Sequence, residues 1–152
     1  MRRRARQARS SRSFVRAGPG ASDYARRVPT WRGSCHCGRI RFEADGELTG
    51  LSVCNCSMCQ RTGYVHWTIP PERFRLLSGA DEIQTYEFGT RVAKHHFCRH
   101  CGISPFRRAR SDPDQVDVNA RCLEDVELDA LETSRFDGRN WEAAFAERER
   151  SR

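Results

Sequence analysis

The sequence lacks any run of about 20 consecutive apolar residues, which is the length that a helix needs to cross a bilayer. Its N-terminus also lacks the apolar core of a secretory signal. From these two absences we expect a soluble, cytoplasmic protein with no membrane partner. At 152 residues the chain has the length of one domain, which is enough to bury a single hydrophobic core.

Acidic residues are scarce at one end of the chain. Residues 1–30 contain nine arginines and only Asp23 as an acid, a net charge of +8, whereas the whole chain carries +7. Residues 31–152 are therefore nearly neutral. Because long-range attraction to phosphate needs a basic face on the folded part, we expect no nucleic-acid partner except through the N-terminal arm.

The Arg-rich segment 1–30 also lacks apolar periodicity, so it cannot offset the entropy lost on ordering. We expect a disordered extension, followed by a zinc-binding domain at 31–146 and a charged tail at 147–152. Three interpretations of the extension remain open: a start site set too far upstream, an organelle-targeting peptide, or a basic arm that contacts anionic polymers. We favour an extension without a function of its own.

Short segments with a period of two dominate from Trp31 onward, beginning with Ile40, Phe42 and Ala44, which share one face. Turn-forming Gly, Pro, Asp and Ser separate these segments. Further strands are expected at 48–54, 64–69, 74–77, 82–88, 92–97, 105–107 and 115–120. Many short strands are typical of an antiparallel, mainly β domain. We expect the aromatic residues of these strands in the core, namely Tyr64, Trp67, Tyr86, Phe88 and Phe97.

Only the C-terminal end shows a helical pattern. Trp141, Ala144 and Phe145 fall on one face of a segment that Asn140 can cap. We expect a short helix there, which frays in the charged tail.

Eight cysteines are a high number for a cytoplasmic chain, where metal binding explains clustered cysteines better than disulfides do. Cys35 and Cys37 are too close in sequence for an unstrained disulfide, and so are Cys54 and Cys56. Cys122 stands apart from the other seven, which form three clusters: Cys35 and Cys37; Cys54, Cys56 and Cys59; Cys98 and Cys101.

The sequence Cys98-x-x-Cys101-Gly is typical of a zinc knuckle, because its tight turn points two thiolates at one metal and the glycine relieves backbone crowding. A tetrahedral ion needs two more ligands. The Gly-terminated pair Cys35 and Cys37 is the natural source, so these four residues predict a structural zinc site.

Cys54, Cys56 and Cys59 remain as a second, local cluster. Three ligands leave one of the four zinc positions for water or substrate, as in catalytic sites. Two alternatives remain: Cys122 closes this cluster as a fourth ligand, or the clusters exchange members. Either alternative makes both sites structural.

Three motifs together resemble the glutathione-dependent formaldehyde-activating enzyme family: GSCHCGRIRF at 33–42, CNCSMCQR at 54–61 and HFCRHCGISPF at 96–106. The similarity covers Trp31 to about Ala146. It continues through 110–113, 118–123 and 136–142, which look like the branch containing centromere protein V.

The resemblance implies an Mss4-like zinc-binding fold of antiparallel sheets that carries two zinc ions. It implies a structural role for the four-cysteine set and a catalytic role for Cys54, Cys56 and Cys59. It further implies a carbon–sulfur lyase whose named reaction joins glutathione to formaldehyde as S-(hydroxymethyl)glutathione. Because zinc favours a thiolate over a thiol, an incoming thiol, glutathione or another, can act as a nucleophile toward the aldehyde.

Other side chains are candidates for parts of this chemistry. A proton must move as a thiol adds to an aldehyde, so His66, His95 and His96 are candidate general acids, although a histidine in a strand is more often a packing residue. Arg61 follows the second cluster and is a candidate partner for a glutathione carboxylate. A second function stays open: a non-catalytic zinc-stabilised binding module whose basic arm contacts nucleic acid or another anionic partner.

Overall fold

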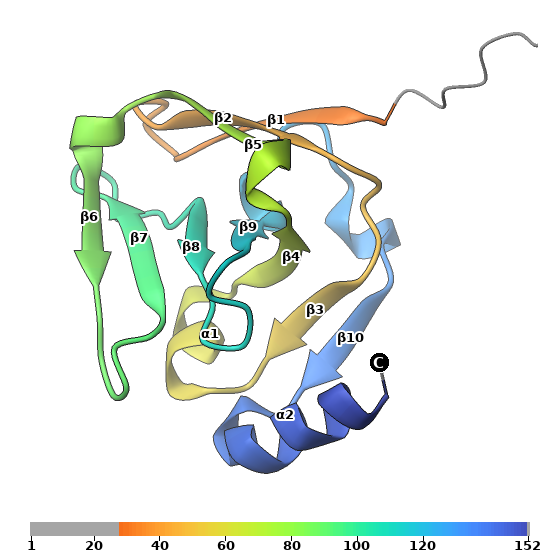
Figure 1. Cartoon of the computed structure of the whole chain (residues 1–152). Helices are drawn as coiled ribbons and strands as arrows, with labels where there is room; N and C mark the ends of the chain where they lie inside the picture. The colour runs from red at the N-terminus through yellow and green to blue at the C-terminus, as the bar shows by residue number, and fades with distance from the viewer. Residues whose placement is uncertain (1–27, 152) are drawn as a thin grey trace, which may run out of the picture.

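The computed structural model describes residues 28–151, and its strands form two β-sheets (Figure 1). The chain is mainly β, and its sheets are antiparallel apart from one strand pair, so the expected fold class is confirmed. Almost all of the expected extension at 1–30 lies outside the described residues.

The smaller sheet has three antiparallel strands in the order β1-β2-β5. These are β1 (Thr30–Ser34), β2 (Arg41–Asp45) and β5 (Phe74–Ser78). In β2, Phe42 and Ala44 are fully buried while their neighbours are not, as the period of two predicts.

The larger sheet has seven strands in the order β10-β3-β4-β9-β8-β7-β6. All neighbours are antiparallel except β10, which runs parallel to β3 and was not expected from the sequence. The strands are β3 (Leu51–Cys54), β4 (Val65–Ile69), β6 (Ile83–Tyr86), β7 (Lys94–Cys98), β8 (Phe106–Arg108), β9 (Val116–Asn119) and β10 (Thr133–Phe136).

Aromatic rings join the two sheets in the core. Phe42 of β2 stacks on Phe74 of β5 with 5.4 Å between ring centroids, and Phe74 lies 4.7 Å from Phe106 of β8. Tyr64 and Trp67 are buried as expected. Tyr86 and Phe88 are not, with 50% and 42% of their surface exposed. The expectation was wrong for these two because they lie on or just beyond β6, an edge strand of the larger sheet.

Two α-helices and five 3₁₀ turns complete the described chain. The short helix α1 (Ser57–Thr62) follows β3 and was not expected. No helix within residues 28–151 has the length and apolarity to span a membrane. The 3₁₀ turns are η1 (Pro71–Arg73), η2 (Ala80–Glu82), η3 (Ala120–Cys122), η4 (Leu128–Ala130) and η5 (Gly138–Asn140).

The C-terminal helix α2 (Trp141–Arg150) confirms the expected helix but extends further along the chain. Trp141 and Phe145 stack on its inner face at 4.6 Å. Arg148 forms an ion pair of 2.8 Å with Asp112, which holds the last turn where fraying was expected. Asn140 occupies the N-cap position without capping, since its side chain donates to Asp137 instead.

Candidate metal centres and their surroundings

The first cysteine cluster brings together the four residues expected to bind a structural zinc. The Sγ atoms of Cys35, Cys37, Cys98 and Cys101 all lie within 4.8 Å of one another. Cys37 Sγ is 3.6 Å from Cys35 Sγ and 3.7 Å from Cys98 Sγ. A tetrahedral zinc with bonds of about 2.3 Å places its sulfurs about 3.8 Å apart, so this set fits one zinc ion.

The local backbone explains how each pair converges. Gly38 and Gly102 follow the two cysteine pairs with φ angles of 73° and 74°, a left-handed conformation that only glycine adopts readily. Their N–H groups close the turns by donating to the carbonyls of Cys35 and Cys98, at 3.0 and 2.9 Å. One pair lies in the turn after β1 and the other at the end of β7, so a bound ion would tie the two sheets together.

The second cluster is built within one segment. Cys54 ends β3, Cys56 occupies the N-cap position of α1 and Cys59 lies within that helix. Their Sγ atoms also lie within 4.8 Å of one another. Backbone N–H groups of Cys56 and Cys59 donate to the sulfurs of Cys54 and Cys56, both at 3.4 Å, and so favour thiolates.

Cys122 belongs to neither cluster among the described residues. Its Sγ faces the carbonyl of Ser104 at 3.8 Å, and burial raises the pKa of its thiol to about 12. In this geometry Cys122 does not join the three-cysteine cluster, which therefore has three candidate ligands among the described residues. The two cysteine groups are also separate sets, without exchange of members.

Hydrogen bonds within the second cluster separate the pKa values of its thiols. The contact with Cys54 raises the pKa of Cys59 and lowers that of Cys56 far below the ordinary value. The contact with Cys56 raises the pKa of Cys54. Three sulfurs this close compete for protons, and a divalent cation among them removes the competition by favouring all three thiolates.

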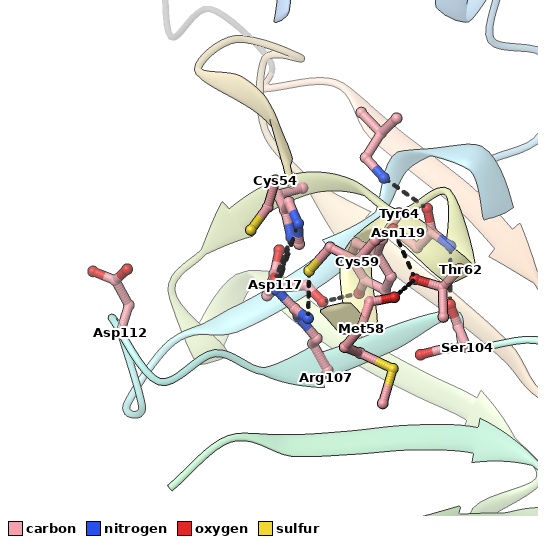
Figure 2. Close-up of polar contacts among 12 residues, drawn as sticks. Cys54, Met58, Cys59, Thr62, Tyr64, Ser104, Arg107, Asp112, Asp117 and Asn119 are labelled. Atoms are coloured by element: carbon pink, nitrogen blue, oxygen red, sulfur yellow. Dashed lines mark hydrogen bonds and ion pairs between the residues drawn. The ribbon is translucent and has the colours of Figure 1, made fainter. Parts of the chain in front are cut away.

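A buried polar network lies directly against Cys59 (Figure 2). Arg107 of β8 donates from Nη1 to Cys59 Sγ at 3.3 Å and from Nε to Asp117 Oδ2 at 2.7 Å. His66 Nδ1 lies 2.8 Å from the same carboxylate oxygen. The hydroxyl of Tyr64 donates to the carbonyl of Asp117 at 2.6 Å, and Arg107 lies over the Tyr64 ring. Every member of this network is buried.

Asp117 and Arg107 of this network favour their charged forms despite their burial. Burial opposes the charge on Asp117, but the hydrogen bond from His66 and the charge of Arg107 hold the pKa of this carboxyl below its usual value. Burial also opposes the charge on Arg107, and the Asp117 carboxylate raises the pKa of the guanidinium above it.

The three candidate histidines have different surroundings. His66 is held by Asp117 within the network, and His96 bonds to Thr85 through Nδ1 at 2.8 Å. His95 pairs with Arg107 across β7 and β8, so both side chains lie on one face of the sheet. Its buried Nε2 has no hydrogen-bond partner among the described residues.

Next to the second cluster lies a surface hollow of about 480 Å³, lined by Ser57, Gln60, Arg61 and Arg139. Arg61 donates to the Ser57 carbonyl at 2.7 Å, and Arg139 donates to Gln60 Oε1 at 2.8 Å. These partners are neutral, so both positive charges stay available to an anion in the hollow. Arg61 was expected as a candidate carboxylate ligand, whereas Arg139 was not recognised.

Three further residues of the site were not predicted from the sequence, namely Arg107, Asp117 and Gly138. Arg107 is one of 27 basic residues, and nothing in its local sequence distinguishes it. The signal for Asp117 is an acid between two valines of a strand, Val116 and Val118, all three of which are buried. Gly138 contacts the cluster from the C-terminal segment, as its tight packing on Cys54 shows.

Comparison with known proteins agrees with this geometry. A crystal structure of a Rhodobacter sphaeroides protein has 37% sequence identity and a TM-score of 0.64, over 68% of this chain and 98% of that chain. The model of the family described as glutathione-dependent formaldehyde-activating enzyme matches residues 30–137, which include both cysteine clusters. The chain therefore belongs to the glutathione-dependent formaldehyde-activating enzyme family.

Proposed function

We propose that this protein is a zinc-dependent carbon–sulfur lyase that joins a thiol to an aldehyde and cleaves the product in reverse. The expected pair is glutathione and formaldehyde, which combine as S-(hydroxymethyl)glutathione. The observation that carries the proposal is the three-cysteine cluster, which gathers Cys54, Cys56 and Cys59 without a fourth cysteine from residues 28–151. The closer similarity to the centromere protein V branch remains a prediction.

Each cysteine cluster would hold one zinc ion. Cys35, Cys37, Cys98 and Cys101 complete a tetrahedron, so that ion is structural. Cys54, Cys56 and Cys59 fill three positions and leave one for an exogenous ligand. Zinc bound there supplies a Lewis acid that favours the thiolate form of an incoming thiol.

The adduct forms when the thiol sulfur bonds to the carbonyl carbon. The thiol gives up its proton, the carbonyl π electrons move to oxygen, and that oxygen gains a proton to become a hydroxyl. The reverse reaction breaks the same carbon–sulfur bond and releases both components, with no oxidant or reductant in either direction.

Arg61 and Arg139 bind the thiol substrate through its carboxylates. Glutathione carries two carboxylates, and a guanidinium is suited to bind a carboxylate with two parallel hydrogen bonds. The two arginines line the hollow beside α1, the helix that carries Cys59. This arrangement favours an acidic thiol over a neutral one.

The test uses exchange NMR on an equilibrium mixture of glutathione, formaldehyde and their adduct. It measures the rate at which the adduct forms and breaks down, and the rate without protein is subtracted. Elemental analysis measures the zinc content of the same protein. We expect two zinc ions per chain in the wild type and one in Cys56→Ser. The protein-dependent rate should fall at least about 100-fold in this variant, because a catalytic metal contributes several kcal/mol. Cys122→Ser is the matched control and should keep both ions and the rate.

A Cys56→Ser protein that loses one zinc but keeps the full rate would overturn the proposal. A wild type that never accelerates the exchange would instead favour the non-catalytic binding module. The basic arm on which that alternative depends lies outside the described residues except for 28–30.

A further inference from the structure

The guanidinium of Arg107 has different neighbours on its two edges. Asp117 Oδ2 accepts from Nε at 2.7 Å, and His66 Nδ1 lies 3.1 Å from Nη2, so these residues occupy one edge. Nη1 on the other edge points at Cys59 Sγ, 3.3 Å away. Figure 2 shows Arg107 between Asp117 and Cys59 in this arrangement.

Burial makes this contact strong. Cys59 is 3% exposed, Arg107 9% and Asp117 1%, so little water screens the charges. A charge-assisted hydrogen bond is about twice as strong as a neutral one. Asp117 balances the formal charge of Arg107, so the buried pair acts as a dipole whose positive end faces the sulfur.

From this geometry we propose that Arg107 is a positioning residue for the second metal centre. Its Nη1 hydrogen bond holds Cys59 as a thiolate ligand and reduces the electron density that this sulfur donates to the ion. Asp117 and His66 fix the guanidinium in the required orientation. The inference rests on the proposed zinc binding at Cys54, Cys56 and Cys59.

The reason that such a residue matters is the charge of the site. Three thiolates and one Zn²⁺ have a net charge of −1, which weakens the attraction of the ion for a fourth, anionic ligand. A hydrogen bond to one thiolate withdraws electron density from it and restores part of that attraction. Residues that contact metal ligands in this way change metal affinity or activity by about 10- to 100-fold.

The test compares Arg107→Gln with Arg108→Gln by chelator competition and by the absorption spectrum of the cobalt(II)-loaded protein. Arg108 is the neighbouring arginine of β8 and donates to the carbonyl of Gln115, so it is a matched control. We expect Arg107→Gln to weaken metal binding at the three-cysteine site by about 10- to 100-fold. Its sulfur-to-cobalt charge-transfer band should move to longer wavelength, because the sulfur electrons are less stabilised. Arg108→Gln should change neither.

Loss of Arg107 alone leaves Asp117 as an uncompensated buried charge, which can unfold the protein. The double variant Arg107→Gln/Asp117→Asn removes both charges and keeps a polar side chain at each position. It should fold and show the same band shift and weaker binding.

A folded Arg107→Gln protein with the metal affinity and the cobalt spectrum of the wild type would overturn the role of Arg107. If that protein still bound two ions, the proposed function would remain intact. A wild type that binds no ion at the three cysteines would overturn the proposed function itself. The two failures are thus distinguished without an activity measurement.

Discussion

Gly138 packs on Cys54 so closely that no Cβ fits between them. A Cβ built at position 138 would lie 2.9 Å from Cys56 Cβ and would overlap Cys54 Sγ. The C-terminal segment after β10 therefore forms one wall of the three-cysteine cluster. The parallel pairing of β10 with β3 brings this segment there.

We expect Gly138→Ala to displace Cys54 and to remove one of the two zinc ions while the protein stays folded. Elemental analysis and circular dichroism check both outcomes. Gly50→Ala is a suitable control, because nothing lies within 4 Å of its added methyl group. Its φ of 66° makes it strained, so it should lower stability by about 1 kcal/mol but keep both ions. Two ions in Gly138→Ala would contradict the packing argument.

The four-cysteine site should be needed for folding itself. Cys98 is fully buried, and its Sγ lies in the four-cysteine cluster, where β7 meets the turn after β1. We expect Cys98→Ser to lower the melting temperature by about 10 °C or more, because structural zinc binding contributes directly to folding free energy. Cys122→Ser, outside both clusters, should shift it by only a few degrees. Equal shifts in the two variants would show that the cluster does not hold a structural ion.

The basic hollow should determine the affinity for the thiol. We expect Arg61→Gln and Arg139→Gln each to raise KM for glutathione by about 2- to 5-fold, as for exposed ion pairs, with zinc content unchanged. Added salt should reduce the difference from wild type because it screens the same charges. An exposed arginine of η1 provides the control, Arg73→Gln, which should leave KM unchanged. A neutral thiol substrate should be insensitive to all three variants.

His95 should make the protein sensitive to mild acid. Burial, assisted by the charge of Arg107, lowers the pKa of His95 to about 4 from an ordinary 6.5. In the unfolded chain His95 therefore becomes protonated below about pH 6.5, whereas in the folded protein it becomes protonated only near pH 4. The contribution of His95 to stability is complete above pH 6.5 and is lost as the pH falls toward 4.

Replacing His95 with phenylalanine removes this proton and retains a ring to stack on Phe88, 5.3 Å away. Between pH 7 and pH 5, the unfolding free energy of the wild type should fall by about 1 to 2 kcal/mol more than that of His95→Phe. Urea titrations at the two pH values measure this difference. Acid release of metal affects both proteins and cancels in the comparison. Parallel losses in the two proteins would contradict the assignment.

The cysteine clusters could be predicted from the sequence because most of their geometry is local. Each pair or triplet lies within six residues, and glycines in the left-handed conformation follow Cys37 and Cys101 as the knuckle pattern requires. Their division into a group of four and a group of three also follows the predicted assignment. The ions themselves remain a proposal.

The rest of the site depends on strand register, which the local sequence does not contain. Arg107 meets Asp117 because they are direct partners across β8 and β9. Helix α1 has only six residues, too few to show an apolar period. Tyr86 follows the same alternation as a core residue, and only its place on the edge of the sheet exposes it.

The residues around the two cysteine clusters are completed at different stages of synthesis. All four cysteines of the first cluster have been made once Cys101 is in place, whereas Gly138 and Arg139 come from the end of the domain. As the chain emerges N-terminus first, the four cysteines can therefore come together before Gly138 closes the wall of the three-cysteine cluster and before Arg139 completes the neighbouring hollow.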